Sequence, residues 1–250
     1  MAQATHSEHV NAVARALSLL DAFTIDDPTL GLAELSRRTR MPKTTALRLA
    51  RSLGARGYLT AVESGAWRLG PATAWLGARY QVAFDVHNLI EPVMRDLVRA
   101  TRHSVSYFVH DGDSRIRLLR IPGEDEDVRK ARVGEPMPLE KGSPGQVLLA
   151  FTGRQGKLYE EIRKRGFHFT IGEANKGSAS VAAPVFGARW NVVGALCIGV
   201  PARDASESIL KSFAPKLMKA AENLSRALSK DQSGHSPLTL ARATWHPGGQ

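Results

Sequence analysis

The sequence contains a single cysteine, Cys197, among its 250 residues. One cysteine excludes an internal disulfide and any zinc or iron–sulfur site built from several cysteines, so we expect a reducing compartment, the cytoplasm. Long hydrophobic runs are also missing. None reaches the ~18 to 20 residues of a membrane helix, and the polar residues 1–9 lack the apolar core of a secretory signal. We therefore expect no membrane partner and no export by that route.

Motifs of catalysis are missing as well. The sequence has no G-x-S-x-G, no H-E-x-x-H and no phosphate-loop lysine. Cys197 lies in an apolar segment, GALCIGV, which raises the pKa of a thiol, so we interpret it as a core residue rather than a nucleophile. The acidic run 123–127 has no metal-ligand spacing and indicates a solvated loop. The sequence therefore predicts no enzyme activity, no metal site and no cofactor.

Acidic residues are the minority among the charged ones. There are 24 Asp and Glu against 34 Lys and Arg, a net charge of +10, which favours a polyanionic partner such as nucleic acid or an anionic surface. The densest basic stretch, residues 36–57, holds seven Lys and Arg and no acidic residue. A solvated helix face would explain such a stretch equally well, so charge alone does not decide.

Hydrophobic periodicity predicts three helices in the N-terminal part: residues 10–23, a shorter helix from about Ala33, and a third after Met41-Pro42. The first is expected to bury residues at helical spacing, namely Val10, Val13, Ala14, Leu17 and Leu20. In the third, one face is apolar: Ala46, Leu49, Ala50 and Leu53. The opposite face carries Thr44, Arg48 and Arg51, which are side chains that bind bases and phosphates in a major groove.

Two short strands, residues 58–62 and 66–69, are predicted to follow as a hairpin around Glu63-Ser64-Gly65. Three helices and a hairpin form a winged helix-turn-helix. The strings ALSLLDAF, LAELSRRTRMPKTTALRLARSLGARGYLT and WRLG resemble the DNA-binding domain of the IclR family of bacterial transcriptional regulators. Its motifs match at L-x-E-L (32–35), M-P-K-T-T (41–45), R-G-Y-L (56–59) and R-L-G (68–70).

Charge, helix face and resemblance together favour DNA binding over a solvated face. The residues expected to contact DNA are Arg38, Pro42, Lys43, Thr44, Thr45, Arg48, Arg51 and Arg68. The wing tip, residues 62–66, is less basic than is usual in the family, which leaves Arg68 as the only cation of the wing.

Helices and strands mix in the rest of the chain. Pro71 begins a helix that either packs on the first domain or, as the resemblance implies, joins two subunits. A helix over 85–102, with Leu89, Val93, Leu97 and Val98 inward, precedes strands at 105–109 and 115–121. A further helix is expected to run through Ala150. Its N-cap would be Ser143, its first residue Pro144 and its capping-box partner Gln146. A last helix is expected over 206–228.

The helix after Ser143 has two interpretations. It is only a well-capped structural element, or its N-terminus also faces a pocket and binds a carboxylate. The resemblance to the IclR family favours the second interpretation, because residues 132–151, 166–185 and 193–201 are similar to its effector-site segments. Carried over by position, the effector-facing candidates are Ser143, Gly145, Thr170, Glu173, Ser180, Cys197 and Gly199. The family often has Asp at position 170, Cys at 180 and Ser at 197 and 199, and its segment after Phe151 is usually longer.

The sequence thus predicts an α+β protein in which a winged helix-turn-helix is joined by a linker helix to a GAF-like α/β effector-binding domain. The expected boundaries are a flexible arm (1–9), the DNA-binding domain (10–70), the linker (71–84), the effector-binding domain (85–230) and a disordered tail (231–250). The expected partners are double-stranded operator DNA, a small organic acid, either ring-bearing or aliphatic, and a second copy of the chain in a dimer or a dimer of dimers. The alternative is a small-acid sensor that acts through protein partners without operator binding.

Overall fold

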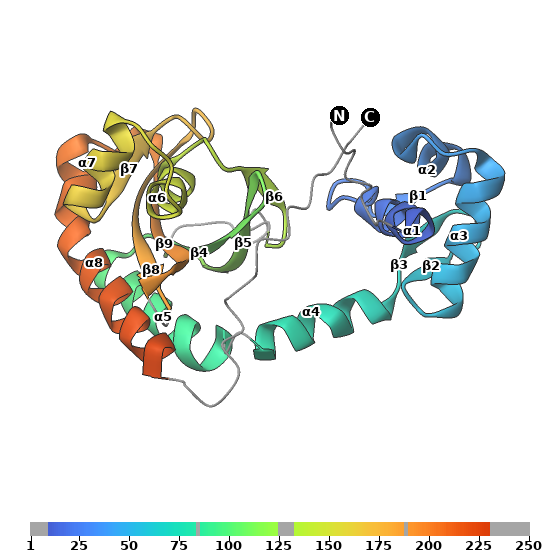
Figure 1. The fold of residues 1–250 in the computed structure, drawn as a ribbon, viewed down its shortest axis with the longest axis horizontal. Helices are drawn as coiled ribbons and strands as arrows, with labels where there is room; N and C mark the ends of the chain where they lie inside the picture. Colours follow the sequence, from blue (N-terminus) through green and yellow to red (C-terminus); the bar gives the residue numbers. More distant parts are fainter. Residues whose placement is uncertain (1–9, 84–85, 125–132, 188–189, 231–250) are drawn as a thin grey trace, which may run out of the picture. The chain divides into compact units, whose positions relative to one another are not determined.

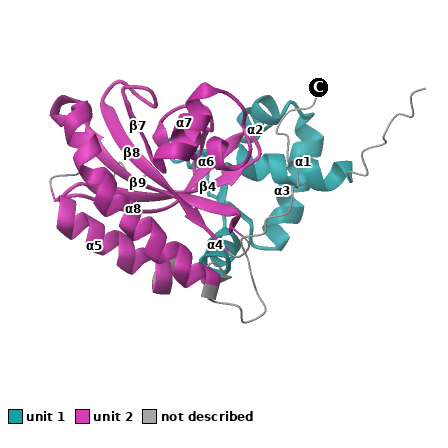
Figure 2. Cartoon of the chain, turned by 60° about the vertical axis from the view of Figure 1, so that its left-hand side comes forward, with its two compact units in different colours: residues 1–81 teal, residues 82–250 magenta. Residues whose placement is uncertain are grey.

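The structure, a computed structural model, describes residues 10–83, 86–124, 133–187 and 190–230. The expected flexible arm and disordered tail, and positions 125–127 of the acidic run, lie outside these residues. The chain divides into two compact units between Gln81 and Val82 (Figure 2). No helix in the described ranges has both the length and the hydrophobicity needed to cross a bilayer.

The N-terminal unit places its helices around a small antiparallel sheet with the strand order β1-β3-β2 (Figure 1). Its elements are α1 (Asn11–Asp21), β1 (Thr29–Leu30), α2 (Leu32–Thr39), α3 (Lys43–Ala55), β2 (Leu59–Ala61), β3 (Trp67–Leu69) and the linker helix α4 (Pro71–Ala83). The predicted helices and hairpin are all present. Strand β1 was not predicted, because two residues are too short to show an alternating pattern.

Turn chemistry sets the angle between α2 and α3. Helix α2 ends at Arg40, which takes the left-handed conformation at φ 53°, and the chain turns through Met41 and Pro42 into α3. The core below these helices contains Leu35, Ala46, Ala50 and Trp67, all buried. Two alanines on α3 let the three helices approach closely, so the opposite side of α3 stays at the surface.

The inward face predicted for α1 was wrong at four of its five residues, and only Leu20 of that set packs against the core. Val10, Val13 and Leu17 are 67%, 56% and 50% exposed, whereas Leu19 is fully buried and Phe23 nearly so. The periodicity was correct, but α1 has two apolar stripes and only the one through Leu19 packs on the unit's core. The other, which we call the α1 stripe (Val10, Val13 and Leu17), faces solvent.

The second unit is built on a six-stranded antiparallel sheet with the order β6-β5-β4-β9-β8-β7. Its elements are a π-helical turn (Val86–Ile90), α5 (Glu91–Thr101), β4 (Ser104–Asp111), β5 (Ser114–Ile121), β6 (Pro136–Pro138), α6 (Ser143–Phe151), α7 (Lys157–Arg165), β7 (His168–Ile171), β8 (Ser178–Phe186), β9 (Val192–Pro201), a 3-10 turn (Ala202–Asp204) and α8 (Glu207–Lys230). Helices α5 and α8 lie along one face of the sheet, and α6 and α7 cover the other (Figure 1). This arrangement confirms the α+β class.

The segment expected to form one helix over 85–102 is interrupted. The π-helical turn precedes α5 because Pro92 has no N–H to donate to the carbonyl four residues earlier. The shift in register also changes the buried face. Ile90, Met94 and Leu97 are buried, whereas the expected inward residues Leu89 and Val93 are only half-buried.

Strand β9 is one of the two central strands of the sheet and pairs with β4, the other one, and with β8. Alternate residues of β9 face opposite sides. Ala195 and Cys197 pack in one cluster with Val147 and Leu148 of α6, so this face of the sheet and helix α6 enclose the candidate ligand site.

Candidate nucleic-acid interface and ligand site

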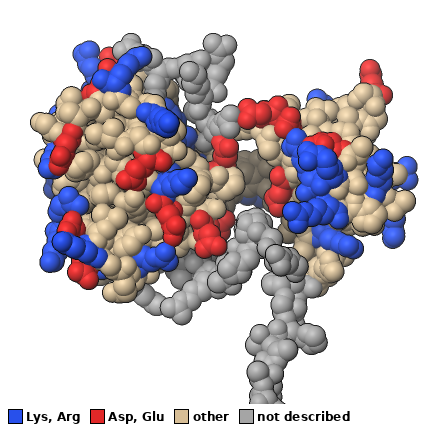
Figure 3. Space-filling model, turned by 90° about the horizontal axis from the view of Figure 1, so that it is seen from above, with Lys and Arg blue, Asp and Glu red and all other residues tan. Residues whose placement is uncertain are grey.

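Helix α3 has one buried and one solvent-facing side. Ala46 and Ala50 have no exposed surface, whereas Lys43, Thr44, Arg48 and Arg51 are exposed and Thr45 is half-buried. Among the residues that the structure describes, no carboxylate pairs with Lys43, Arg48 or Arg51. Figure 3 shows Lys and Arg side chains gathered over the N-terminal unit. Helix α3 therefore presents unpaired cations and hydroxyl groups to solvent.

The N-terminus of α3 adds a second cationic feature. Pro42 is exposed and occupies the N-cap position, and no side chain caps the helix. The first-turn N–H groups and the positive end of the helix dipole accordingly face outward beside Lys43. This is the geometry in which a helix N-terminus receives a phosphate.

Arg38 differs from the other predicted DNA contacts. Its Nε donates to Glu34 at 2.6 Å, one Nη donates to the carbonyl of Ala22 at 3.0 Å, and the other donates to Asp27 at 2.7 Å. The Arg37 and Arg38 guanidinium groups lower the pKa of Glu34 to about 2. Arg38 thus ties α2 to the end of α1 and to the following loop. Because its donors are engaged within the unit, its predicted contact with DNA stays a prediction.

The wing keeps one cation, as predicted. Arg68 is exposed on the middle strand β3, opposite Thr29 of β1 and Thr60 of β2. The turn at its tip closes with the Val62 N–H donating to the Ala66 carbonyl at 2.9 Å, and Gly65 supplies the positive φ of 76°.

The candidate ligand site lies at the N-terminus of α6. The predicted capping box was wrong: Gly142, at φ 80°, is the N-cap and Ser143 is the first residue of the helix. The Ser143 hydroxyl lies 2.8 Å from that of Ser180 on β8, and its N–H donates to the Thr170 hydroxyl at 3.0 Å. Bonds to two strands therefore replace the local cap.

The side chain of Gln146, the expected capping-box partner, hydrogen-bonds to Glu173 instead of to the backbone at the N-cap. Oε2 of Glu173 accepts from Nε2 of Gln146 at 2.8 Å and from the N–H of Gly142 at 3.3 Å. The chain thus supplies its own anion to this helix N-terminus, where an effector carboxylate was expected.

The remaining candidates complete one cluster. Cys197 on β9 is 4% exposed, so it is a core residue as predicted, and burial raises the pKa of its thiol. Gly199 pairs with Ser180 across β9 and β8, and a Cβ there would lie 3.0 Å from the Ser104 hydroxyl. Gly145 lets α6 approach the chain before it, since a Cβ would lie 1.8 Å from the Leu139 carbonyl oxygen. All seven predicted residues therefore lie around the start of α6.

Sequence reasoning missed Arg115, which belongs to this cluster. Its side chain, from β5, is 1% exposed and lies against the first turn of α6: a Cβ on Gly145 would be 3.1 Å from Nη1. Arg115 and Arg117 stand two residues apart on one strand and so share a face. Both guanidinium groups lie near the Phe108 ring, at 5.5 and 5.2 Å from its centre. Two arginines on one face of a strand predicted to be half-buried, Arg115 and Arg117, were the sequence signal that could have indicated this site.

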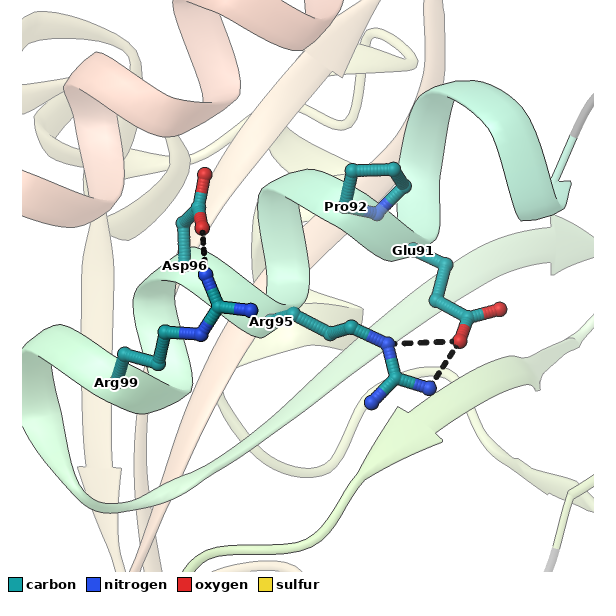
Figure 4. Close-up of a pocket in the computed structure, with 5 residues that line it drawn as sticks. All are labelled: Glu91, Pro92, Arg95, Asp96 and Arg99. Carbon is teal, nitrogen blue, oxygen red and sulfur yellow. Dashed lines mark hydrogen bonds and ion pairs between the residues drawn. The ribbon is translucent and has the colours of Figure 1, made fainter.

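A shallow surface pocket of about 290 Å³ lies elsewhere, on α5 (Figure 4). Its charged residues pair with one another, Arg95 with Glu91 and Arg99 with Asp96 at 3.1 Å. These pairs span one helical turn and lie at the surface, so the pocket has no unpaired group for a ligand.

The two units define a class of protein. A three-helix unit with a two-stranded wing and a solvent-facing basic helix is a winged helix-turn-helix, here followed by a separate α+β unit. Family models agree: residues 12–63 match the IclR helix-turn-helix domain, and residues 156–226 match the C-terminal domain of the bacterial transcriptional regulator IclR. Both units of the chain thus match models of the IclR family of transcriptional regulators.

Full-length comparisons give the same result. The HTH-type transcriptional regulator KipR of Bacillus subtilis is 27% identical over 242 residues, which cover 86% of this chain and 96% of KipR. The structure of an IclR family regulator from Brucella abortus has a TM-score of 0.75 at 25% identity, covering 90% of this chain and 96% of that one. An IclR homologue from Microbacterium hydrocarbonoxydans, solved with 4-hydroxybenzoate, has a TM-score of 0.71 at 21% identity, covering 87% and 99%. The relatives are regulators, which confirms the prediction that the chain is not an enzyme.

Proposed function

We propose that the protein is a homo-oligomeric transcription factor that reads an operator with helix α3 and responds to a small organic acid. One observation carries the proposal: Lys43, Arg48 and Arg51 lie unpaired on the outer side of a helix whose inner side is buried. Unpaired cations at this spacing match phosphates and guanine edges in a major groove. Because such a regulator acts on the chromosome, we place it in the cytoplasm.

The roles of the exposed residues follow from their positions. Lys43, Thr44 and Pro42 lie at the N-terminus of α3, where the helix dipole favours a phosphate. Arg48 and Arg51 lie further along the same exposed side, where a helix in the major groove meets base edges. We assign phosphate contact to Lys43 and Arg68, and base contact to Arg48.

Exposed apolar surface supports self-association. The α1 stripe is joined in the same unit by α4, on which Trp75 and Leu76 are 59% and 47% exposed. Large apolar side chains that stay this exposed on one unit are typical of an interface between subunits. A two-fold dimer would place two α3 helices about one DNA turn apart, ~34 Å or a multiple of it.

The effector site is the cluster at the start of α6, in a domain that we interpret as GAF-like. Its hydroxyl groups, Ser143 and Ser180, and the buried Arg115 favour a ligand with an anionic and a polar group. The relative from Microbacterium hydrocarbonoxydans was solved with 4-hydroxybenzoate, a ligand of this class. An acid that binds the DNA-competent and incompetent states with different affinity shifts their populations and so regulates operator binding.

The test has two stages. A footprint on the DNA upstream of the protein's own coding region should show two protected half-sites about one helical turn apart. Adding 4-hydroxybenzoate, pyruvate or acetate to the complex should then change the operator Kd by about 5- to 150-fold for the acid that is the effector. Absence of any protected site would refute operator reading and favour a small-acid sensor that acts through a protein partner.

A further inference from the structure

Arg115 is the largest fully buried side chain of the described residues. Its Nη1 donates to the carbonyl of Pro138, at the end of β6. A Cβ on Gly142 would lie 3.6 Å from Nη2, and one on Gly145 would lie 3.1 Å from Nη1. The guanidinium group is therefore held between β5, β6 and the first turn of α6.

The charge of this group is not balanced within the described part of the chain. No carboxylate there lies within 4.0 Å of Arg115, and neither Nε nor Nη2 has a hydrogen-bond partner. Glu173 accepts from Gly142 and Gln146 instead. Burial lowers the pKa of Arg115 to about 10, which still leaves it a cation at neutral pH.

A buried, unpaired guanidinium is a poor structural element. Desolvating a charge without a counter-ion is strongly unfavourable, and an apolar side chain of similar length would fill the same space at no such cost. The one carbonyl bond and the contact with the Phe108 ring 5.5 Å away offset only part of it. The arrangement becomes favourable when an anion completes it.

We propose that Arg115 binds the carboxylate of the effector through its Nε and Nη2 edge. The edge presents two parallel N–H groups, which match the two oxygens of one carboxylate, while Nη1 stays anchored on Pro138. Cys197 lies in the field of Arg115 and beside the hydroxyl groups of Ser143 and Ser180. These hydroxyls are the groups that would meet a polar substituent on the rest of the acid. The inference rests on the proposed effector function and adds the residue that selects an acid over its neutral analogue.

The test compares wild type, Arg115→Met, Arg115→Lys and a surface control, Arg203→Met, whose side chain is 84% exposed. Binding of 4-hydroxybenzoate, benzoate, pyruvate and acetate is measured by calorimetry and thermal unfolding at matched ionic strength, with 4-hydroxybenzamide and benzamide as neutral analogues. Wild type and Arg203→Met should bind at least one acid and neither amide. Arg115→Met should weaken that acid about 10- to 100-fold, and Arg115→Lys by less, because it keeps the charge but loses the fork.

Thermal unfolding without ligand separates a binding role from a structural one. Arg115→Met should unfold at the wild-type temperature or above, because it removes a buried unpaired charge. A large fall in that temperature, or failure to fold, would show a structural arginine and overturn the inference. Equal acid binding by wild type and Arg115→Met would also overturn it and leave the proposed function intact. If wild type binds none of the four acids, the proposed effector function fails and the inference with it.

Discussion

Lys43 and Arg48 should respond differently to mutation, although both are exposed cations on one helix. They lie five residues apart on α3, or about 7.5 Å along its axis. Lys43 stands at the N-terminal turn, where a phosphate is favoured, and Arg48 in the middle of the outer side. Lys43→Ala should therefore weaken binding to every DNA sequence, and Arg48→Ala only to the operator.

The size of each effect follows from the kind of contact. Each phosphate contact contributes about 0.9 to the magnitude of the slope of log association constant against log salt concentration. A Lys43→Ala dimer loses one such contact in each subunit, so the magnitude of its slope should fall by about 2. Each base contact is worth about 1 to 3 kcal/mol, so Arg48→Ala should lose about 2 to 6 kcal/mol on a two-site operator. Random duplex should bind the Arg48→Ala protein with an affinity reduced far less.

The assay is fluorescence anisotropy with operator and random duplex at four salt concentrations. Arg99→Ala is the control, since that arginine is a 77% exposed cation on α5 in the other unit. The reasoning would be refuted if the two α3 variants lost the same affinity on both DNAs, because that would mean that α3 contributes only a diffuse positive charge.

Three further predictions concern assembly, pH and packing. Leu17→Asp should raise the dimer dissociation constant, measured by light scattering, at least about tenfold. Ile25→Asp, at an exposed residue outside the α1 stripe, should leave it unchanged. Equal masses for the two variants would exclude α1 from the interface. Burial, aided by Arg165, lowers the pKa of His168 to about 4, so the unfolded state binds more protons between pH 6.5 and 4. The free energy of unfolding should fall by up to about 3 kcal/mol as pH drops through that window, and by clearly less in His168→Gln; parallel pH curves would contradict this. Gly145→Ala brings a Cβ to 1.8 Å from the Leu139 carbonyl oxygen and should lower the free energy of unfolding by about 1 to 3 kcal/mol. An unchanged midpoint of denaturant unfolding would contradict this.

Local patterns predicted the DNA-binding unit well, because its determinants lie within single elements. Met41-Pro42 marks the turn into α3, and the spacing of Ala46 and Ala50 defines its buried side. The inward face of α1 was wrong for a physical reason. An apolar stripe has the same sequence pattern whether it packs on its own core or stays exposed, so Val13 and Leu17 could not be told from Leu19.

The ligand site was harder to predict because its contacts join distant residues. The Ser143 hydroxyl meets Ser180, 37 positions away, so it does not cap its own helix as the local motif indicated. Gln146, the expected capping-box partner, donates instead to Glu173, which is 27 positions away. Arg115 escaped notice because an arginine on a half-buried strand is ordinarily solvent-facing, and only the sheet register and α6 show that it is enclosed.

The most direct test of operator reading is an anisotropy titration of the purified protein against the DNA upstream of its own coding region, with random duplex as the control, at low and at higher salt. The account predicts tight binding to the upstream fragment that persists at the higher salt, where binding to random DNA is lost. Equal and equally salt-sensitive binding to both duplexes would contradict it, and would reduce the basic surface of α3 to non-specific attraction.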